Sequence, residues 1–396
     1  MHVPALARGM HVNHVKIPMK QVKEISPAAL LYRLKNGYSP LLLDVRNEED
    51  FISWKLDAIK NQVNIPYIDF IEDPEGSLKK IPEADDIVVL CAKGGASDYV
   101  ASILRSKGIP TVNVAGGMKA WGALYIHSVI WVEGGASVTQ FNRVGKGCLS
   151  YMIASNGEAA VIDPSRHYEQ YIAHAISNNI KITHVFDTHL HADHLSGGSR
   201  LAQSVGARYY AGGADMKGAE ISFTPIEEGA AFAIGGESLN VVSLASPGHT
   251  PGSTSFFFAD KALFTGDTLF ISSMGRPDLG GHAEEWAGDL WKTTHKYRRF
   301  GDSVIAAPSH TAGLSEYDAK WRVMRTLGEL RRANHLLTIH DEAVFIKAAI
   351  SHLPAEPAEY QKMRNANLGR EKPDEQTMEQ WELGKNRCAL EMARKD

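Results

Sequence analysis

Short apolar runs alternate with helical spacing through the first third of the chain. Three of these runs predict buried parallel strands, at 41–45, 87–90 and 111–114. Residues 99–104 carry apolar positions at helical spacing directly after the second run. This order predicts a small α/β domain over residues 20–128, closed by a loop at Gly116-Gly117 and a turn near Gly122.

The rest of the chain, residues 129–396, has more numerous strands with helices between them. The apolar runs predict strands at 138–141, 150–154, 160–162, 182–186, 241–244, 255–258 and 304–305. Helical spacing appears at 168–177 and 201–204. A charged, helical extension begins at about residue 316, so the second domain is of α+β type with a C-terminal extension.

Composition narrows the class of protein. The chain has 396 residues, 44% of them hydrophobic and 22% charged, which predicts two or three folded domains. A net charge of −4 and the lack of a basic run argue against nucleic-acid binding. No apolar stretch reaches the roughly 18 residues of a membrane span. Residues 1–19 lack a signal-peptide core, and we expect them to form a disordered leader.

Three cysteines are too few for a disulfide framework and predict a reducing, cytoplasmic location. Cys148 lies in an apolar strand and is predicted to be a small core residue. Cys388 lies in a charged tail and is predicted to be inert. Cys91 differs, because it follows the strand at 87–90 and opens a glycine-containing loop in which a helix begins. Backbone N–H groups at such a position favour a thiolate or a bound anionic group.

Polar loops rich in metal ligands follow four apolar strands. The first loop, 188–194, holds three histidines and an aspartate directly after the strand at 182–186. Imidazole and carboxylate groups are the ligands that borderline divalent metals prefer. If the strands share one sheet system, the four loops bring seven ligand-type residues to one point: His189, His191, Asp193, His194, His249, Asp267 and His310.

These loops resemble the motifs of the metallo-β-lactamase superfamily, T-H-x-H-x-D-H followed by G-H-T-x-G-S, G-D and a final histidine. The resemblance implies a four-layer αββα sandwich with a metal site at one edge. Most members are hydrolases with two metals. Carried onto this chain, the pattern places His189, His191 and His249 on the first metal, Asp193, His194 and His310 on the second, and Asp267 between them.

Persulfide dioxygenases of the same fold resemble the chain more closely. Their pattern implies one Fe(II) per chain, held by His189, His249 and Asp267, with His191, Asp193, His194 and His310 around it or vestigial. Gly275-Arg276-Pro277-Asp278 and the segment 353–367 are similar to further features of that family. Arg276 is predicted to bind a substrate carboxylate, with a structural salt bridge to Asp278 as the alternative. His310 is followed by Thr311-Ala312, where glutathione-specific relatives continue His-Asp-Tyr. The identity of the thiol that carries the persulfide is therefore left open.

The first domain resembles a single-domain rhodanese through two segments, 43–51 and 114–121, that flank the Cys91 loop in sequence. The resemblance implies that Cys91 accepts sulfur. The loop lacks the arginine of typical relatives, so Lys93 is the predicted substitute, and a degenerate, non-catalytic domain remains an alternative. Ser97 stands where a cysteine phosphatase needs arginine, which excludes that class.

The two resemblances together predict a rhodanese–persulfide dioxygenase fusion. It would oxidise a low-molecular-weight thiol persulfide, of glutathione or coenzyme A type, with O₂ to sulfite and thiol. Cys91 would transfer sulfur from thiosulfate, and the candidate assembly is a homodimer. The rivals are a two-zinc thioesterase of the glyoxalase II type fused to a sulfur carrier, and a non-catalytic sulfur sensor or scaffold.

Overall fold

The computed structural model describes residues 23–235, 240–351, 353, 356–384 and 386–390. The predicted leader, 1–19, lies outside them. The chain divides into two compact units, and the boundary in the sequence falls between Leu124 and Tyr125. The predicted boundary is at residue 128. No helix in the described ranges combines the length and the apolar character that a bilayer crossing demands.

Unit 1 is built on a five-stranded sheet in the order β1-β5-β4-β2-β3, with every neighbouring pair parallel. Its strands are β1 (Glu24–Ile25), β2 (Leu41–Asp44), β3 (Gln62–Asn64), β4 (Ile87–Leu90) and β5 (Thr111–Val114). Its helices are α1 (Pro27–Lys35), α2 (Glu48–Ser53), α3 (Tyr67–Glu72), α4 (Pro74–Lys79), α5 (Gly95–Ser106) and α6 (Gly117–Gly122). The three predicted strands and the predicted helix are confirmed.

Helix α6 corrects the prediction of a loop and turn over 116–122. Gly116 and Gly117 both have positive φ, 68° and 58°, and they lead the chain into the helix. The N–H groups of Met118 and Lys119 donate to the carbonyl groups of Cys91 and Ala92 at 2.9 and 3.0 Å. These bonds satisfy the first turn of a helix too short to show a period in the sequence.

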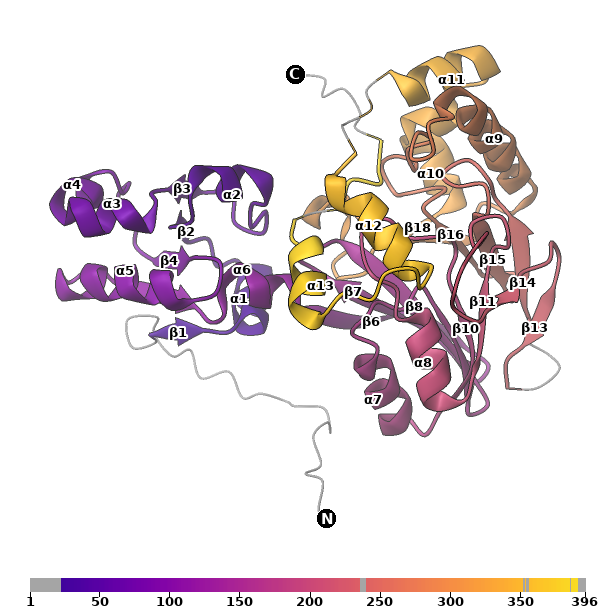
Figure 1. Cartoon of the computed structure of the whole chain (residues 1–396), viewed down its shortest axis with the longest axis horizontal. Coiled ribbons are helices and arrows are strands. Elements are labelled where there is room, and N and C mark those ends of the chain that lie inside the picture. The colour runs from indigo at the N-terminus through magenta and orange to yellow at the C-terminus, as the bar shows by residue number, and fades with distance from the viewer. Residues whose placement is uncertain (1–22, 236–239, 352, 354–355, 385, 391–396) are drawn as a thin grey trace. The chain divides into compact units, whose positions relative to one another are not determined.

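Unit 2 contains two sheets, ordered β12-β11-β10-β9-β8-β7-β6 and β13-β14-β15-β16-β17-β18 (Figure 1). The strands of the first are β6 (Tyr125–Glu133), β7 (Ala136–Arg143), β8 (Cys148–Ser155), β9 (Glu158–Ile162), β10 (Lys181–Phe186), β11 (Arg208–Ala211) and β12 (Thr224–Pro225). Those of the second are β13 (Ala231–Ala233), β14 (Asn240–Ala245), β15 (Thr254–Phe258), β16 (Ala262–Gly266), β17 (Ile305–Pro308) and β18 (Arg325–Thr326). All seven predicted strands of this region are among them.

Helices cover the outer faces of the two sheets. The α-helices of unit 2 are α7 (Glu169–Ser177), α8 (Gly198–Val205), α9 (Ala283–Lys296), α10 (Leu327–Ala333), α11 (Glu342–Ile350), α12 (Ala358–Asn367) and α13 (Glu375–Trp381). Short 3₁₀ helices are η2 (Tyr297–Arg299), η3 (Leu314–Glu316) and η4 (His335–Thr338). One apolar core joins α7 and α8 to the first sheet, and a second core includes α9, α10 and α11. The predicted αββα sandwich with a helical C-terminal extension is confirmed.

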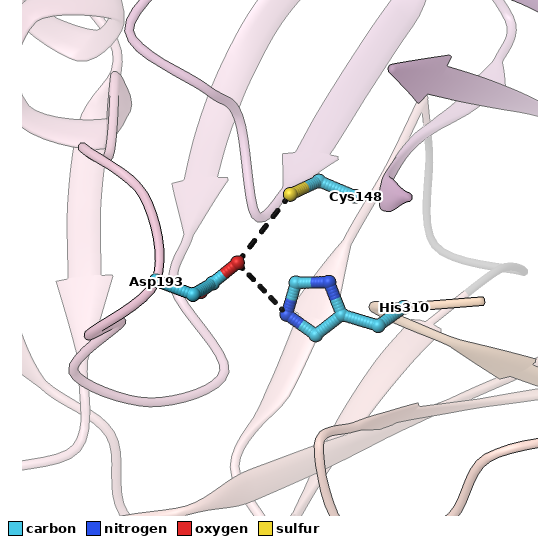
Figure 2. A group of neighbouring side chains, drawn as sticks. All are labelled: Cys148, Asp193 and His310. Atoms are coloured by element: carbon cyan, nitrogen blue, oxygen red, sulfur yellow. Dashed lines mark hydrogen bonds and ion pairs between the residues drawn. The ribbon is translucent and has the colours of Figure 1, made fainter. Parts of the chain in front are cut away.

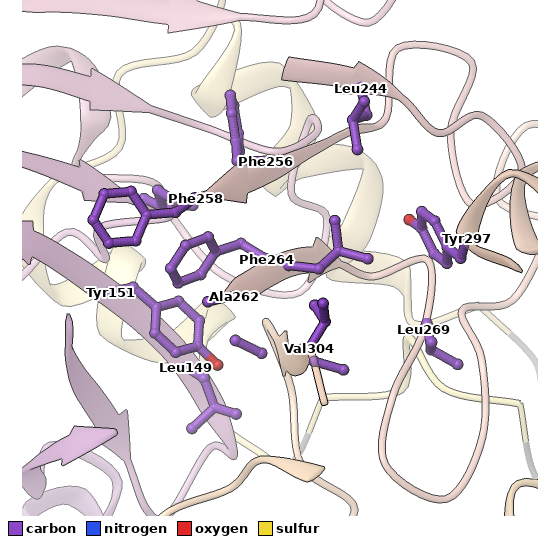
Figure 3. Packing of buried hydrophobic residues seen from close by; sticks show 14 of the residues in the cluster. Leu149, Tyr151, Leu244, Phe256, Phe258, Ala262, Phe264, Leu269, Tyr297 and Val304 are labelled. Atoms are coloured by element: carbon purple, nitrogen blue, oxygen red, sulfur yellow. The ribbon is translucent and has the colours of Figure 1, made fainter. Parts of the chain in front are cut away.

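The space between the two sheets is filled by aromatic and aliphatic side chains (Figure 3). Tyr151 of β8 meets Phe264 of β16 with ring centroids 5.0 Å apart, and Phe256 of β15 lies in the same cluster. Buried aromatic side chains contribute a large share of core stability through the apolar area they remove from water. This packing holds the edges of both sheets together, and the metal-ligand loops lie at one such edge.

Strand direction determines which loops meet there. β14 and β16 are both antiparallel to β15, and β17 is parallel to β16. The three strands β14, β16 and β17 therefore point the same way, and the loops after them leave the sheet at the same edge.

Candidate metal centre

The ligand loops place three of the predicted residues in one compact group. His189 follows β10, His249 follows β14 and Asp267 follows β16, and each offers an atom within 4.8 Å of the other two. Asp267 Oδ2 lies 3.6 Å from His189 Nε2 and 3.4 Å from His249 Nε2. All three side chains are buried. We refer to these residues as the His189 group.

Hydrogen bonds to the far side of each ring leave Nε2 of both histidines available to a metal. His249 Nδ1 lies 2.9 Å from the carbonyl oxygen of Arg276, which can only accept, so Nδ1 carries the proton. His189 Nδ1 lies 2.8 Å from Thr188 Oγ1, whose own proton goes to Asp163 at 2.9 Å. Such partners orient metal-binding histidines.

Burial keeps the imidazoles in the form that binds metals. It lowers the pKa of His189 well below its usual value, and the neighbouring imidazoles, His191 first, lower it further. Burial likewise lowers the pKa of His249, and Asp267 opposes it only in part. Both rings are therefore neutral at physiological pH, as a nitrogen ligand must be.

Unsatisfied polar atoms in the His189 group fit a bound cation. His189 Nε2 and both carboxylate oxygens of Asp267 are buried without a hydrogen-bond partner among the described residues. Buried polar atoms are nearly always satisfied, and unpaired ones need an explanation such as an ion. Two imidazoles and one carboxylate also form the donor set of non-haem Fe(II) sites.

A second group surrounds Asp193 and corrects the prediction for Cys148. The Cys148 thiol is not in apolar surroundings, because Sγ lies 3.5 Å from Asp193 Oδ2 (Figure 2). His310 Nε2 lies 3.5 Å from the same oxygen. Cys148, Asp193 and His310 again offer atoms within 4.8 Å of one another, and we refer to them as the Cys148 group. His194 lies beside it, with Nδ1 3.0 Å from Asp193 Oδ1.

Cys388 also lies close to the metal-ligand loops. It is fully buried, and its sulfur lies within 4.8 Å of ligand atoms of Asp267 and His310. Its carbonyl oxygen accepts from the Arg276 N–H at 2.9 Å, which fastens the end of the C-terminal extension to the loop after β16. The fold returns this segment of the charged tail to the metal-ligand loops, and the prediction that Cys388 is inert stays a prediction.

His191 is oriented by a carboxylate that the sequence analysis did not identify. Asp163, directly after β9, accepts from His191 Nε2 at 3.2 Å and from the Thr188 N–H at 2.7 Å. His191 Nδ1 is left buried and without a partner among the described residues. Asn367 at the end of α12 donates to the carbonyl groups of His191 and His194, at 2.9 and 3.0 Å. The sequence could have identified Asp163, since it follows a buried strand just as Asp267 does.

Arg276 is buried in a forked pair with Asp278, at 2.7 Å from Nε to Oδ1 and 2.6 Å from Nη2 to Oδ2. The salt bridge weighed as the alternative to a substrate contact is thus present. A contact between Arg276 and a substrate carboxylate stays a prediction.

In unit 1, Cys91 lies at the end of β4 as predicted, and α5 begins within its loop at Gly95. Its sulfur is 3.0 Å from the Gly94 N–H and 3.1 Å from Ser97 Oγ. Gly94 has φ 99°, and this left-handed conformation turns its N–H toward the thiol. Lys93 is exposed. The Gly94 N–H donates to the sulfur at the amino end of a helix, which suits a bound anionic sulfur group, whereas the Ser97 hydroxyl donates to Asn113 Oδ1 at 2.7 Å.

Comparison with known proteins agrees with this architecture. Residues 143–310 match the family described as the metallo-beta-lactamase superfamily, and residues 27–124 match the rhodanese-like domain. A metallo-beta-lactamase structure from Staphylococcus aureus superposes with a TM-score of 0.55 at 30% sequence identity, covering 60% of this chain and 74% of that one.

Two activities occur among the curated relatives that the chain resembles. A hydroxyacylglutathione hydrolase of Rhodospirillum rubrum is 35% identical over 157 residues, 39% of this chain and 58% of that protein. The mitochondrial persulfide dioxygenase ETHE1 of Bos taurus is 30% identical over 198 residues, 48% of this chain and 70% of that protein. The chain spans 58%, 51% and 58% of the length of three of the hydrolases it matches.

Proposed function

The chain belongs to the metallo-β-lactamase superfamily and carries a rhodanese-like domain, and from this premise we propose that it is a persulfide dioxygenase coupled to sulfur transfer. The reaction would consume a thiol persulfide, O₂ and water, and release the thiol, sulfite and protons. The observation that carries the proposal is the His189 group, a two-histidine, one-carboxylate set, in the same chain as a hydrogen-bonded sulfur-transfer cysteine.

The His189 group would hold one Fe(II), which supplies the binding and activation of O₂ at its open positions. Thr188 and the Arg276 carbonyl group hold the two imidazoles so that each Nε2 lone pair faces inward. Burial of the group keeps bulk water away from a reactive sulfur species.

Cys91 would attack the outer sulfur of thiosulfate, release sulfite and form a protein persulfide, whose outer sulfur would then pass to a low-molecular-weight thiol and leave the Cys91 thiol free again. The Gly94 N–H would hold the charged sulfur, and exposed Lys93 would attract the anionic donor. Glutathione and coenzyme A are the two carriers to compare. The cytoplasmic location and the homodimer stay predictions.

The test is O₂ uptake and sulfite release with preformed glutathione persulfide and coenzyme A persulfide after anaerobic Fe(II) loading. His249→Ala should abolish uptake, whereas Cys91→Ser should retain it, since preformed persulfide needs no sulfur transfer. With thiosulfate and thiol as the source, both substitutions should abolish uptake. The control is His335→Ala, an exposed histidine in η4, which should behave as wild type. No uptake with any persulfide would sink the proposal and favour a non-catalytic sulfur sensor.

The second candidate is a two-metal thioesterase, favoured by the unpartnered Nδ1 of His191 and by the approach of Asp193, His194 and His310 to one another. It predicts two zinc ions per chain and hydrolysis of glutathione thioesters. Metal analysis of anaerobically purified protein, with both activities measured on the same preparation, separates the two candidates.

A further inference from the structure

We infer that Cys388 accepts sulfane sulfur from the small-molecule persulfide and carries it into the metal centre. The species oxidised there is then a persulfide of the chain itself, Cys388–S–SH. The inference rests on the dioxygenase proposed above and names its immediate substrate as a protein persulfide. It departs from the sequence-based prediction that Cys388 is inert.

The Cys388 thiol lies inside the metal centre, although it comes from the C-terminal extension. Its side chain is fully buried, and its sulfur lies within 4.8 Å of ligand atoms of Asp267 and His310. Asp267 belongs to the His189 group, so this sulfur lies beside the residues that would hold the iron. A persulfide adds a second sulfur at about 2 Å from Sγ. That length is sufficient to bring the outer sulfur among these ligand atoms.

His310 supplies a second, independent indication that this space receives a ligand. Only 1% of its surface is exposed, and neither ring nitrogen has a hydrogen-bond partner among the described residues. Buried polar atoms are nearly always paired. The thiol itself makes only a weak contact, at 3.9 Å to the Tyr360 hydroxyl. An additional sulfur on Cys388 would give the His310 ring a partner that the thiol alone does not.

The segment that carries Cys388, residues 386–390, is fastened to the loop after β16 by backbone hydrogen bonds, and we refer to it as the C-terminal strap. The Arg276 N–H donates to the Cys388 carbonyl oxygen at 2.9 Å, and the Leu390 N–H donates to the Met274 carbonyl oxygen at 2.9 Å. Water can replace such bonds at little net cost, so a short segment held by them can open locally and close again.

Burial of the metal centre favours a sulfur carrier that belongs to the chain. His189, His249 and Asp267 are each at most 2% exposed. A glutathione or coenzyme A persulfide would have to bring its whole carrier into this space, whereas Cys388 brings a single sulfur atom. Opening of the C-terminal strap would expose Cys388 to the small-molecule persulfide, and closing would return the loaded sulfur to the metal centre.

The chemistry balances as two steps. In the first, the Cys388 sulfur attacks the outer sulfur of R–S–SH, the S–S bond of that persulfide breaks, and an S–S bond to Cys388 forms. The thiol proton of Cys388 leaves with the released thiol, R–SH, and no electrons are gained or lost overall. In the second, Cys388–S–SH, O₂ and water give the Cys388 thiol, sulfite and two protons. The outer sulfur loses the four electrons that O₂ takes up.

The test measures sulfur on Cys388 in metal-free protein without O₂, where no oxidation occurs. Cys91→Ser protein, which lacks the other predicted sulfur acceptor, is incubated with glutathione persulfide, freed of small molecules, denatured, alkylated and digested. We expect mass spectrometry to show the mass of one additional sulfur atom on the peptide that contains Cys388. Cys148 is the internal control and should gain none, because β8 is hydrogen-bonded between β7 and β9 and cannot open as the strap can.

The loaded protein is then reconstituted with Fe(II) and exposed to O₂ without any thiol. We expect it to release one sulfite per chain and to recover the Cys388 thiol. Cys388→Ser and Cys388→Ala should both lose O₂ uptake with glutathione persulfide. Their metal content, measured beside that of wild type, shows whether the His189 group is intact.

Cys388 that stays free of sulfur in a protein that oxidises glutathione persulfide overturns the inference, and so does wild-type O₂ uptake in either Cys388 variant. A wild-type protein that takes up no O₂ contradicts the dioxygenase proposal instead. The loading of Cys388 needs neither metal nor O₂ nor a Cys388 variant, so it decides in every case whether this residue accepts sulfur.

Discussion

Asp163 is the residue through which the metal-ligand loop is held in place. It accepts from His191 Nε2 and Thr188 Oγ1, and the latter in turn orients His189. Burial alone would raise its pKa, but His191 and the hydrogen bonds outweigh burial and hold that pKa below the usual value. The charged carboxylate is therefore available to both partners throughout the physiological pH range.

Asp163→Asn should weaken metal binding by about 10–100-fold, the usual cost of removing an outer partner of a ligand. The amide keeps the volume but offers one acceptor oxygen in place of two. Affinity is measured by competition with a chelator of known strength. Asp289→Asn, on the surface of α9, is the matched control and should bind metal as wild type does. Equal affinities in the two variants would contradict the role given to Asp163.

The sequence pattern predicted the histidines and Asp267 but not Cys148 and Cys388. The histidines and Asp267 lie in short loops after apolar strands, and such loops gather at a sheet edge. Cys148 lies in β8, whose residues are all buried, so period-two alternation does not distinguish the side facing the metal-ligand loops. Cys388 depends on a return of the C-terminal segment, which is a tertiary contact without a local signal.

At the scale of elements, α13 is anchored by a buried carboxylate at its carboxyl end. Glu382 Oε2 pairs with Arg143 at 2.8 Å and with Arg166 at 2.9 Å, and Oε1 accepts from the Leu195 N–H at 2.9 Å. Burial alone would raise the pKa of Glu382, but the two arginines and this N–H outweigh burial and hold the pKa well below its usual range. The C-terminal extension is thus tied to β7 and to the loop that carries His194.

Glu382→Gln should destabilise unit 2 by about 3–5 kcal/mol, because two buried arginines lose the buried carboxylate that they share. The expected fall in Tm is on the order of ten degrees. Glu375→Gln is a close control: Glu375 also pairs with Arg166, but its side chain is 64% exposed, and exposed pairs contribute about 0–1 kcal/mol. Similar losses in the two variants would contradict the argument.

The lowered pKa of Glu382 also predicts how the stability of unit 2 changes with pH. A carboxyl whose folded-state pKa is depressed contributes stability above its unfolded pKa, about 4.3, and loses it as pH falls toward the folded value. The Tm difference between wild type and Glu382→Gln should be constant from about pH 5.5 to 8 and shrink below about pH 4. Thermal unfolding followed by circular dichroism across this range measures it. A difference that grows on acidification would exclude Glu382 as the source.

Apolar runs predicted the central strands well and the edge strands poorly. β8, β9 and β10 lie inside the first sheet and read as apolar runs. β6 is an edge strand in which only Ile130 is buried, and its apolar run at 129–132, next to the expected domain boundary, was not predicted as a strand. The short helix α6 was not predicted for a different reason, since backbone hydrogen bonds to the Cys91 loop define its start.

At the scale of the whole molecule, each unit has its own apolar core. Among the described residues, one cluster contains only residues of unit 1, such as Leu43, Val89 and Leu104, and clusters elsewhere contain only residues of unit 2. The hydrogen bonds described for Cys91 come from unit 1, and those described for the His189 group come from unit 2. Each unit therefore contains the described residues that hold its own candidate reactive groups.

Residues 125–396 expressed alone should fold and oxidise preformed persulfide at the rate of the full chain, because the His189 group and the residues that orient it all lie in this unit. The truncated protein should lose O₂ uptake supported by thiosulfate and thiol, as the full-length Cys91→Ser variant should. Cooperative thermal unfolding and metal content establish that the fragment is folded before activity is compared. A folded, iron-loaded fragment inactive with preformed persulfide, beside an active full-length Cys91→Ser protein, would show that unit 1 contributes to the oxidation itself.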